Sequence, residues 1–445
     1  MELIIIKKNI EGEGNMKVLW IVNTIFPYPA EQINCNKSVY GGWLNGLANS
    51  LVKYNRIKLC IVTTYNGKTL LHFNDSIIDY YLVPGGTIFK YNPRLNKYAK
   101  EIIEQFEPNI IHIHGTEFAH SLSFIETVKS LNIPIITSIQ GLVSVYSENY
   151  FAGISERELK RNYTIRDIIK HDGVFSGKRS FYKRGIYEKS IIRMSDFILG
   201  RTCWDYANTK VINPDEKYCI MNEILRDCFY KNSWNIEKVR QHSIFTSQGN
   251  YPIKGLHYLI EAISFLKKQY PDVKLYVSGQ NIIDTKTLKN RFKMTGYGKY
   301  IKKLIHKHHL EENVIFLGQL NEVQMKEQLL KTNVFVLPSA IENSSNALCE
   351  AMILGIPCVA TNSGGTMDMI NHNVEGFLYP YNEPAVCAKY ISDFFESTEL
   401  CITISNSARK KALERHDPRS NIKRLVEIYN NATEYKKRGL QYKYE

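Results

Sequence analysis

Short runs of apolar residues alternate with stretches of helical periodicity along the chain. One series of such runs occupies the first half of the sequence, and a second series occupies the second half. Runs of this length, rich in Val and Ile, predict β-strands. In the first half we expect strands at Val18–Ile25, Leu59–Thr64, Tyr80–Val83, Ile110–His114, Ile135–Ile139, Phe197–Leu199 and Tyr218–Met221. In the second half we expect them in SIFTSQG from Ser243, VKLYVSG from Val273, VIFLGQL from Val314, VFVLPS from Val334, PCVAT from Pro357 and GFLYP from Gly376.

Segments with helical periodicity separate many of these runs. The helices that we expect include Gly42–Lys53, Glu117–Ser130, Leu256–Gln269, Lys299–His309 and Glu322–Lys331. Apolar strands that cross over to helices are typical of parallel sheets buried on both faces. Two successive series therefore predict an α/β protein with two Rossmann-like, doubly wound domains. Ligands of such sheets bind at the carboxyl ends of the strands, so we expect a deep cleft between the domains.

The length of 445 residues suits two domains of ordinary size. We place an N-terminal domain at 16–230 and a C-terminal domain at 231–417. Residues 1–15 precede the first expected strand, and we interpret them as a flexible extension. The remaining segment, 418–445, is expected to form a C-terminal helix that packs back toward the N-terminal domain.

Basic residues outnumber acidic ones, and the formal charge is +13. Such an excess suits anionic partners, including nucleotide phosphates, nucleic acid and acidic membrane surfaces. The segment 142–193 interrupts the strand–helix alternation, and its part 157–193 carries eleven Lys and Arg against four Asp and Glu. It is either a solvated insertion or a surface for anionic lipid or an anionic acceptor. Nucleic acid is disfavoured because no recognition motif accompanies the charge.

The nine cysteines have no short spacing typical of a zinc or redox site. Most of them sit in hydrophobic runs, which favours buried, reduced thiols in a cytosolic protein. We find no apolar run of about 18 residues that could span a membrane, and the first residues lack the apolar core of a secretory signal. The expected location is therefore the cytoplasm, with association at the inner face of the cell membrane left open.

Two carboxylates, Glu342 and Glu350, stand eight residues apart in SAIENSSNALCEAM. Glu342 follows the expected strand VFVLPS, and Glu350 lies in an expected helix that Ser344 or Ser345 can cap and Gly355 can end. Eight helical residues rise about 12 Å, whereas a glycosidase pair is about 5–9.5 Å apart. This favours two separate contacts on an elongated ligand. Because a helix start attracts phosphate, a nucleotide diphosphate-sugar matches the pattern.

The segment VFVLPSAIENSSNALCEAMILGIPCVATNSGGTMDMINHNVEGFLYP resembles the donor-binding region of retaining glycosyltransferase family 4. The E-x7-E spacing, EAM, GIPCVAT and SGG stand in the order of that family. The resemblance continues through KGLHYLIEAI, VIFLGQL and YGGWLNGLANSL, and it covers most of the chain from Met16 onward. It implies the two-domain GT-B fold and a nucleotide-sugar donor, with UDP- or GDP-sugars as the leading candidates and no cofactor.

The resemblance also implies roles for individual residues. Glu350 would hold the ribose hydroxyls, and Glu342 would contact the transferred sugar near its reacting side. Lys254, in YPIKG, would neutralise the charge that builds on the diphosphate leaving group. The other expected donor contacts are the backbone groups of Asn343, Ser344, Ser345 and Asn346 and the glycine pairs Gly41 with Gly42 and Gly364 with Gly365.

Two positions depart from the family pattern. The arginine that usually precedes the lysine by about five residues is missing, since the window reads SQGN; Arg201 and Arg226 are our candidates to replace it. Gln140 stands where the family often has a histidine, so an imidazole base at that position is in doubt. The usual mechanism of same-face attack, in which the departing phosphate takes the acceptor's proton, needs no protein base.

His112 and His114 lie on one expected strand, IIHIHG, and we expect them to point to opposite faces. His114 is nearer the carboxyl end and is a candidate acceptor or sugar contact, although a structural role is the alternative. No Asp-x-Asp stands in the expected position for a metal-held diphosphate. The resemblance therefore implies transfer without a metal ion.

The resemblance implies a retaining hexosyltransferase that acts on a hydroxyl of a glycan or lipid-linked glycan. Bacterial surface polysaccharide or capsule synthesis is the expected setting. One alternative is a nucleotide-binding scaffold that has lost catalysis, which the missing arginine and histidine motivate. Another is a different GT-B enzyme, such as a sugar-nucleotide epimerase. A nicotinamide dehydrogenase is disfavoured because the first strand–helix loop lacks G-x-G-x-x-G.

Overall fold

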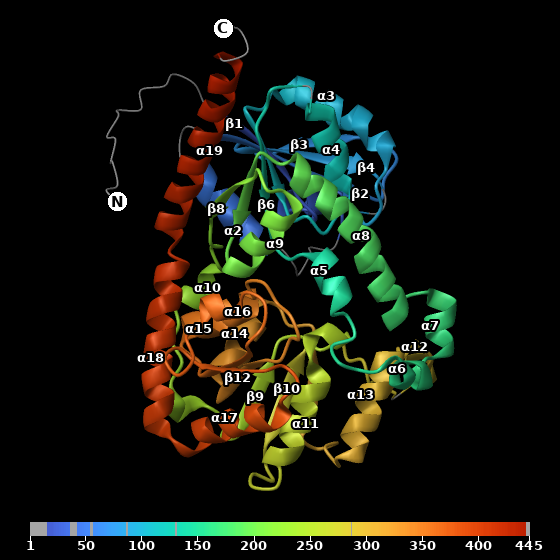
Figure 1. Cartoon of the computed structure of the whole chain (residues 1–445), viewed down its shortest axis with the longest axis vertical. Coiled ribbons are helices and arrows are strands. Elements are labelled where there is room, and N and C mark those ends of the chain that lie inside the picture. The colour runs from blue at the N-terminus through green and yellow to red at the C-terminus, as the bar shows by residue number, and fades with distance from the viewer. Residues whose placement is uncertain are drawn as a thin grey trace.

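The computed structural model of the protein describes residues 16–35, 42–53, 57–85, 88–129, 131–285 and 287–441. These residues form two domains stacked along the long axis of the molecule, each built around its own sheet (Figure 1). Helices cover the sheets, and the strands are largely parallel and buried. The predicted α/β class with two doubly wound domains is confirmed.

The N-terminal domain contains an eight-stranded sheet in the order β3-β4-β2-β1-β5-β6-β7-β8. The strands are β1 (Met16–Ile21), β2 (Ile57–Tyr65), β3 (Leu71–Asn74), β4 (Ile78–Pro84), β5 (Ile110–His114), β6 (Ile135–Ser138), β7 (Phe197–Gly200) and β8 (Lys217–Ile220). All pairings are parallel except that of β3 with β4. The sequence did not predict β3, because this short edge strand is only half-buried and has no apolar run.

The C-terminal domain contains a six-stranded parallel sheet in the order β11-β10-β9-β12-β13-β14. Its strands are β9 (Ser243–Thr246), β10 (Lys274–Ser278), β11 (Val314–Gly318), β12 (Val334–Leu337), β13 (Cys358–Thr361) and β14 (Phe377–Tyr379). Each lies within an apolar run that the sequence singled out. The reversal of strand order between β9 and β12 creates the switch point at which ligands of such sheets bind.

Helices fill the connections of both sheets. In the N-terminal half they are α1 (Pro27–Gln32), α2 (Gly42–Val52), α3 (Asn96–Phe106), α4 (His120–Val128) and α9 (Cys203–Ile212). In the C-terminal half they are α10 (Asp227–Tyr230), α11 (Leu256–Leu266), α12 (Leu288–Lys293), α13 (Gly296–Lys307), α14 (Glu322–Leu330), α15 (Asn346–Leu354), α16 (Thr366–Met369), α17 (Pro384–Glu396), α18 (Thr398–Arg415) and α19 (Pro418–Gln441).

The last helix, α19, returns from the C-terminal domain and packs on the N-terminal one (Figure 1). Its buried residues recur at helical spacing and join the core beside β1 and β5. The hydroxyl of Tyr429 accepts a hydrogen bond from Trp20 Nε1 at 3.0 Å and lies 2.7 Å from His112 Nδ1. The two domains are thus tied together by the chain's own end. The apolar residues of this face are Ile422, Leu425, Ile428, Tyr429 and Ala432.

The insertion forms an arm that leaves the N-terminal sheet and covers the side of the C-terminal domain (Figure 1). It consists of α5 (Val143–Glu148), α6 (Glu156–Asn162), α7 (Ile165–Lys170) and α8 (Val174–Met194). Ile154 and Leu159 belong to the hydrophobic core of the C-terminal domain, and the buried Asp167 carboxylate accepts a hydrogen bond from the Gly296 N–H at 2.8 Å. The interpretation of a solvated insertion is therefore wrong for its inner face, which no local pattern identified.

Candidate functional site

A cavity of about 350 Å³ lies between the domains at the carboxyl end of β12. The N-terminal domain contributes Gly42, Trp43, Gln140 and Arg201 to its wall, and the C-terminal side contributes residues around the start of α15. The amino end of α15 therefore faces the gap between the domains. The residues on that side include Arg226, Lys254, Glu342, Ser344, Ser345, Asn346 and Glu350.

The amino end of α15 has no side-chain cap. Ser345 occupies the N-cap position, but its side chain accepts no hydrogen bond from the first turn. The Ser344 hydroxyl instead lies 4.0 Å from Cys349 Sγ. The predicted N-cap position is therefore confirmed for Ser345, but the capping hydrogen bond is absent. The helix ends at Gly355 in a left-handed conformation (φ 84°), as predicted. An uncapped helix start presents free N–H groups and the positive end of the dipole to an anion.

Lys254 and Glu342 form an ion pair at one side of this helix start, with 2.7 Å between Nζ and Oε2. Ser339 Oγ donates to the same carboxylate oxygen at 3.2 Å. Burial alone would lower the Lys254 pKa, but the charge of Glu342 and the hydrogen bond to it raise this pKa above the usual value. The lysine is therefore a fixed cation at neutral pH.

Gly255 allows Lys254 to lie this close to Glu342. The lysine ends a short 3-10 helix, η3 (Pro252–Lys254), and Gly255 then turns the chain in a left-handed conformation (φ 69°). A Cβ at this position would clash with the Pro338 carbonyl oxygen. The glycine is required here because the η3 backbone packs directly against the end of β12.

Glu350 and Arg226 form the second ion pair, on the other side of the helix start. Arg226 Nε and Nη2 donate to the two carboxylate oxygens at 2.8 and 2.7 Å. Burial raises the Glu350 pKa, and the guanidinium acts to lower it. Each glutamate is thus paired with its own cation. This arrangement fits two carboxylates that contact one ligand separately. Arg226 also lies beside Gly42, whose added Cβ would be 3.4 Å from its Cδ.

The Asn343 side chain joins the two domains and is fully buried. Its Oδ1 accepts from Thr202 Oγ1 at 2.6 Å, and its Nδ2 donates to Asp205 Oδ2 at 2.9 Å. Thr202 and Asp205 also form the capping box of α9. Unlike Ser344, Ser345 and Asn346, Asn343 does not line the cavity. The T-x-x-D pattern at 202–205 signals the capping box of α9 in the sequence, but not its contact with Asn343.

Gly364 and Gly365 pack behind the loop that carries Glu342. The Gly365 N–H donates to the Glu342 carbonyl at 2.8 Å, and Gly364 has a left-handed conformation (φ 61°) in which a Cβ would clash with that carbonyl. Neither glycine lines the cavity, so they act on the site by shaping this loop. Gly42 does line the cavity, whereas Gly41 lies outside the described residues.

Arg201 and Gln140 both line the cavity from the N-terminal side. Arg201 is ion-paired with the buried Glu223 and lies over the Trp43 ring at 5.5 Å. Gln140 Nε2 is buried and has no hydrogen-bond partner among the described residues. A free amide donor at this place can serve a ligand hydroxyl.

His112 and His114 point to the same face of β5, with ring centroids 3.9 Å apart. The expectation of opposite faces is wrong because residues two apart on a strand share a face. His114 packs on Trp20 and borders a separate cavity of about 20 Å³. Burial lowers its pKa well below the usual value. It does not line the larger cavity.

Sequence reasoning missed a group of buried charges behind the site. Burial and the nearby Glu188 raise the pKa of Glu117 to about 7, and Glu117 Oε2 has no hydrogen-bond partner within the described chain. Glu188 holds α5 in place by accepting from the N–H groups of Val143 and Ser144 at 2.9 Å each. Only the folded chain brings Glu117 and α8 together.

The described residues contain no group of three His, Cys, Asp or Glu side chains arranged to hold a metal ion. Within the same ranges, no helix combines the length and the apolar character needed to cross a bilayer. All nine cysteines are free thiols.

Comparison with known proteins identifies the C-terminal domain. Residues 230–411 match the family model described as glycosyl transferases group 1. This domain belongs to that family. An uncharacterised glycosyltransferase of Methanocaldococcus jannaschii is 26% identical over 206 residues, which are 46% of this chain and 48% of that protein. N-acetyl-alpha-D-glucosaminyl L-malate synthase of Bacillus anthracis is 27% identical over 139 residues, 31% of this chain and 36% of the relative. The match thus spans less than half of either relative.

Solved structures resemble both domains. Sucrose-phosphate synthase of Thermosynechococcus elongatus superposes with a TM-score of 0.67 at 15% identity and covers 94% of this chain and 98% of its own. HepE of Anabaena in complex with UDP-glucose gives a TM-score of 0.63 at 15% identity, with 94% and 100% coverage. The chain has the GT-B fold that the sequence predicted. At this level of identity the likeness establishes the fold alone.

Proposed function

We propose that the protein is a glycosyltransferase that moves a sugar from a nucleotide diphosphate-sugar to a hydroxyl group. The observation that carries the proposal is the uncapped start of α15, which opens into the interdomain cavity between two carboxylate–cation pairs. A diphosphate suits the helix start, and the two flanking glutamates suit the hydroxyls of the sugar and the ribose. The family match of the C-terminal domain supports the same function.

The reaction that we propose proceeds with retention and without a metal ion. The bond between the anomeric carbon and the diphosphate breaks, and the acceptor oxygen attacks the same face of that carbon. The acceptor's proton passes to the departing phosphate, so no base is needed at Gln140. Lys254 stabilises the negative charge that develops on the leaving group. Arg226 and Arg201, which line the same cavity, stand in for the arginine that is missing near Asn250.

For the donor we propose a UDP- or GDP-hexose, and for the acceptor a glycan or lipid-linked glycan in bacterial surface polysaccharide or capsule synthesis. Support for the donor comes from the HepE structures, which contain UDP or UDP-glucose, and from a TarM structure with UDP and alpha-GlcNAc-glycerol. Support for the setting comes from an Escherichia coli protein named for colanic acid biosynthesis. It is 29% identical over a stretch that covers 37% of this chain and 38% of that protein.

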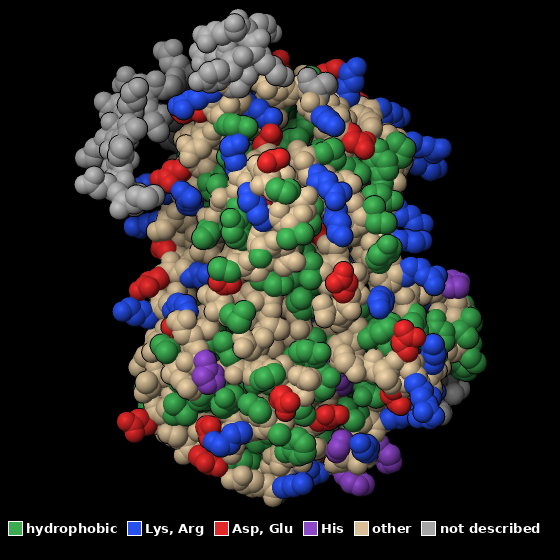
Figure 2. Space-filling view, viewed as in Figure 1, with side chains coloured by type: hydrophobic (Ala, Val, Ile, Leu, Met, Phe, Trp, Pro, Cys, Tyr) green, Lys and Arg blue, Asp and Glu red, His purple; other side chains and the backbone are tan. Residues whose placement is uncertain are grey.

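We further propose a cytoplasmic location with peripheral contact to an anionic membrane. Support comes from the outer face of α7, where Ile165, Ile168 and Ile169 are 73%, 57% and 68% exposed, and from Phe292 on α12, which is 76% exposed. Figure 2 shows hydrophobic side chains gathered at this edge beside basic ones. Apolar side chains flanked by Lys and Arg suit the surface of an anionic bilayer.

The test incubates the purified chain with UDP-, GDP-, ADP- or dTDP-hexoses, with and without added glycan. The quantity measured is the nucleoside diphosphate that is released. We expect release with one of these donors, and we expect Lys254→Ala to lower kcat about 10²–10³-fold because the leaving group loses its fixed cation. Glu350→Ala should weaken nucleotide binding instead. Rates equal to wild type in both variants would contradict the proposal, and binding without any turnover would favour the catalytically inactive scaffold.

A further inference from the structure

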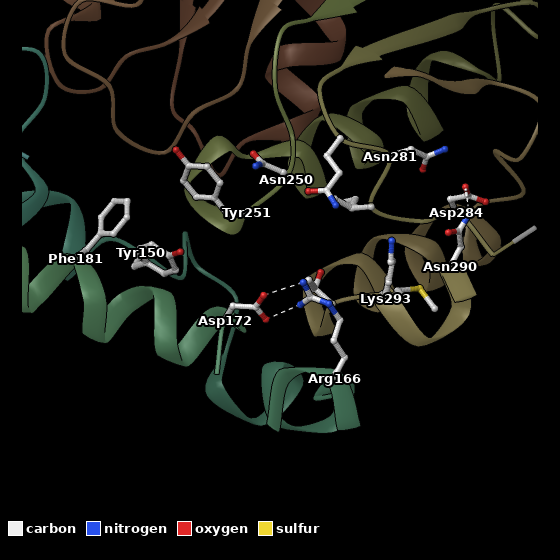
Figure 3. A pocket seen from close by; sticks show the side chains of 14 residues that line it. Tyr150, Arg166, Asp172, Phe181, Asn250, Tyr251, Asn281, Asp284, Asn290 and Lys293 are labelled. Carbon is white, nitrogen blue, oxygen red and sulfur yellow. Dashed lines mark hydrogen bonds and ion pairs between the residues drawn. The ribbon is translucent and has the colours of Figure 1, made fainter. Parts of the chain in front are cut away.

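A second and larger cavity, of about 580 Å³, lies between the insertion arm and the C-terminal domain (Figure 3). This volume falls within the roughly 300–1,000 Å³ typical of small-molecule sites. The arm contributes Tyr150, Arg166, Asp172 and Phe181. The C-terminal domain contributes the loops after β9 and β10 and the junction of α12 and α13. The residues from these segments include Asn250, Tyr251, Asn281, Asp284, Asn290 and Lys293.

Aromatic rings gather at one end of this cavity. The rings of Tyr150 and Tyr251 are nearly parallel, at 18° with centroids 6.1 Å apart, and Phe181 lies edge-on to Tyr150 at 4.9 Å. Tyr251 and Phe181 are both partly exposed. Such rings offer flat apolar surface beside a hydroxyl, which suits a ligand with one apolar face and polar edges.

Amide groups and balanced charges occupy the other end (Figure 3). Two hydrogen bonds, at 2.6 and 2.8 Å, pair Arg166 with Asp172. Asn290 Nδ2 donates to Asp284 Oδ2 at 2.7 Å. With Lys293, the wall carries two cations and two carboxylates, so it has no net charge to attract a polyanion. Amides and paired charges do offer donors and acceptors for hydroxyl groups.

Tyr251 connects this cavity with the transfer site. It immediately precedes η3, and the Lys254 Nζ lies 6.0 Å from the centroid of its ring. On the other side its ring is stacked with Tyr150 at the aromatic end of the second cavity. Tyr251 thus lines the second cavity and lies beside Lys254, which lines the first. The second cavity is therefore a neighbour of the transfer site.

We propose that the second cavity binds uncharged sugar units of the acceptor glycan, behind the unit that receives the transferred sugar. Sugar rings combine apolar C–H faces with hydroxyl edges, and the wall presents aromatic rings and amides for both. The arm would thus select an oligosaccharide over a monosaccharide acceptor. The assignment of these sugar units to the acceptor rests on the proposed transferase function, but their binding to the cavity does not require turnover.

The experiment measures binding of neutral saccharides to the full chain by ligand-observed NMR, without donor. The probes are maltotriose, cellotriose and N,N′,N″-triacetylchitotriose, each against its monosaccharide. We expect at least one trisaccharide to bind at least about tenfold more tightly than its monosaccharide. Asn281→Trp, which fills the cavity from an exposed lining position, should weaken that binding at least about tenfold. Asn431→Trp, at an exposed position of α19, is the matched control and should bind as wild type does.

Three outcomes would overturn the inference. These are no saturable binding of any trisaccharide, equal binding by the Asn281→Trp variant, or displacement of the bound saccharide by sodium pyrophosphate at equal concentration. Failure of the transferase proposal is distinguishable, because donor turnover is assayed separately. If no donor is turned over while trisaccharide binding depends on position 281, the glycan site stands. If turnover occurs equally on monosaccharides and is insensitive to Asn281→Trp, the glycan site is refuted and the transferase remains.

Discussion

At the scale of single residues, the candidate site consists of charges that the fold has already paired. Lys254 holds Glu342, and Arg226 holds Glu350 through two hydrogen bonds. A buried carboxylate without such a partner would be costly to keep ionised. Each glutamate therefore has a cation beside it before any ligand arrives. The diphosphate of the proposed donor would meet these cations already in place at the start of α15.

Glu117 provides a test of pH dependence at this scale. Its pKa in the fold, about 7, is raised from an ordinary value of 4.5 mainly by burial. The groups around it are Glu188, Arg184 and Arg201. Because the folded pKa is raised, the stabilising contribution of the protonated form is fully present below pH 4.5 and is lost as the pH rises through about 7.

We therefore expect Glu117→Gln to stabilise the protein relative to wild type at pH 8 by up to about 3 kcal/mol, and much less at pH 4.5. Melting temperatures of both proteins between pH 4.5 and 8 would measure this difference. Glu101→Gln, at an exposed position of α3, serves as control and should show no such trend. A constant difference across the pH range would contradict the assignment.

At the scale of elements, the insertion arm has two different faces. Its inner face packs in the core of the C-terminal domain, and its charges are partly internal, since Arg184 and Glu188 are buried in α8. The outer face of α7 instead leaves three isoleucines exposed. The high count of basic residues in the sequence therefore combined two populations, one structural and one on the surface.

The exposed face of α7 leads to a prediction about membranes. The double variant Ile168→Glu/Ile169→Glu should lower binding to vesicles of phosphatidylserine and phosphatidylcholine at least about fivefold, because it removes apolar contact and adds negative charge. Co-sedimentation with vesicles measures the effect. Val211→Glu, at a position of α9 that is 83% exposed, is the control. Unchanged sedimentation of the double variant would argue against contact through α7.

At the scale of the whole molecule, the two domains are connected at several separate places. α19 packs on the N-terminal domain, the arm packs on the C-terminal one, and Asn343 bonds to Thr202 and Asp205 beside the site. The Asn343 contact differs from the others because it also fixes the loop that carries Glu342. Domain position and site geometry are thus coupled through one side chain.

This coupling can be tested with two buried asparagines. Asn343→Ala should lower the free energy of unfolding by about 1–3 kcal/mol and weaken nucleotide binding, because a bonded polar side chain is lost between the domains. Asn313→Ala removes bonds to the Pro271 and Val273 carbonyls within one domain, at 3.2 and 2.8 Å. It should lower stability similarly and leave nucleotide affinity intact. Chemical denaturation and nucleotide titration of both variants measure this. Equal losses of affinity would show that the effect is only one of stability.

The sequence by itself determined the fold class and the position of the central elements. Strand β5 has the bounds that were predicted, and Gly355 ends α15 as expected. Such features follow from neighbours along the chain, because apolar periodicity and glycine conformation act within a few residues. β3 was missed because an edge strand needs no apolar run. The same-face packing of His112 and His114 was available from strand geometry and was misjudged.

The tertiary structure alone decided which cation faces which glutamate, the link from Asn343 to Thr202 and Asp205, and the cavity under the arm. The residues of these contacts are separated by up to 141 positions. Their pairing depends on how two sheets, an insertion and a returning helix stack, and no local periodicity encodes that arrangement. The positions of the charged residues were therefore visible in the sequence, whereas their partners came from long-range packing.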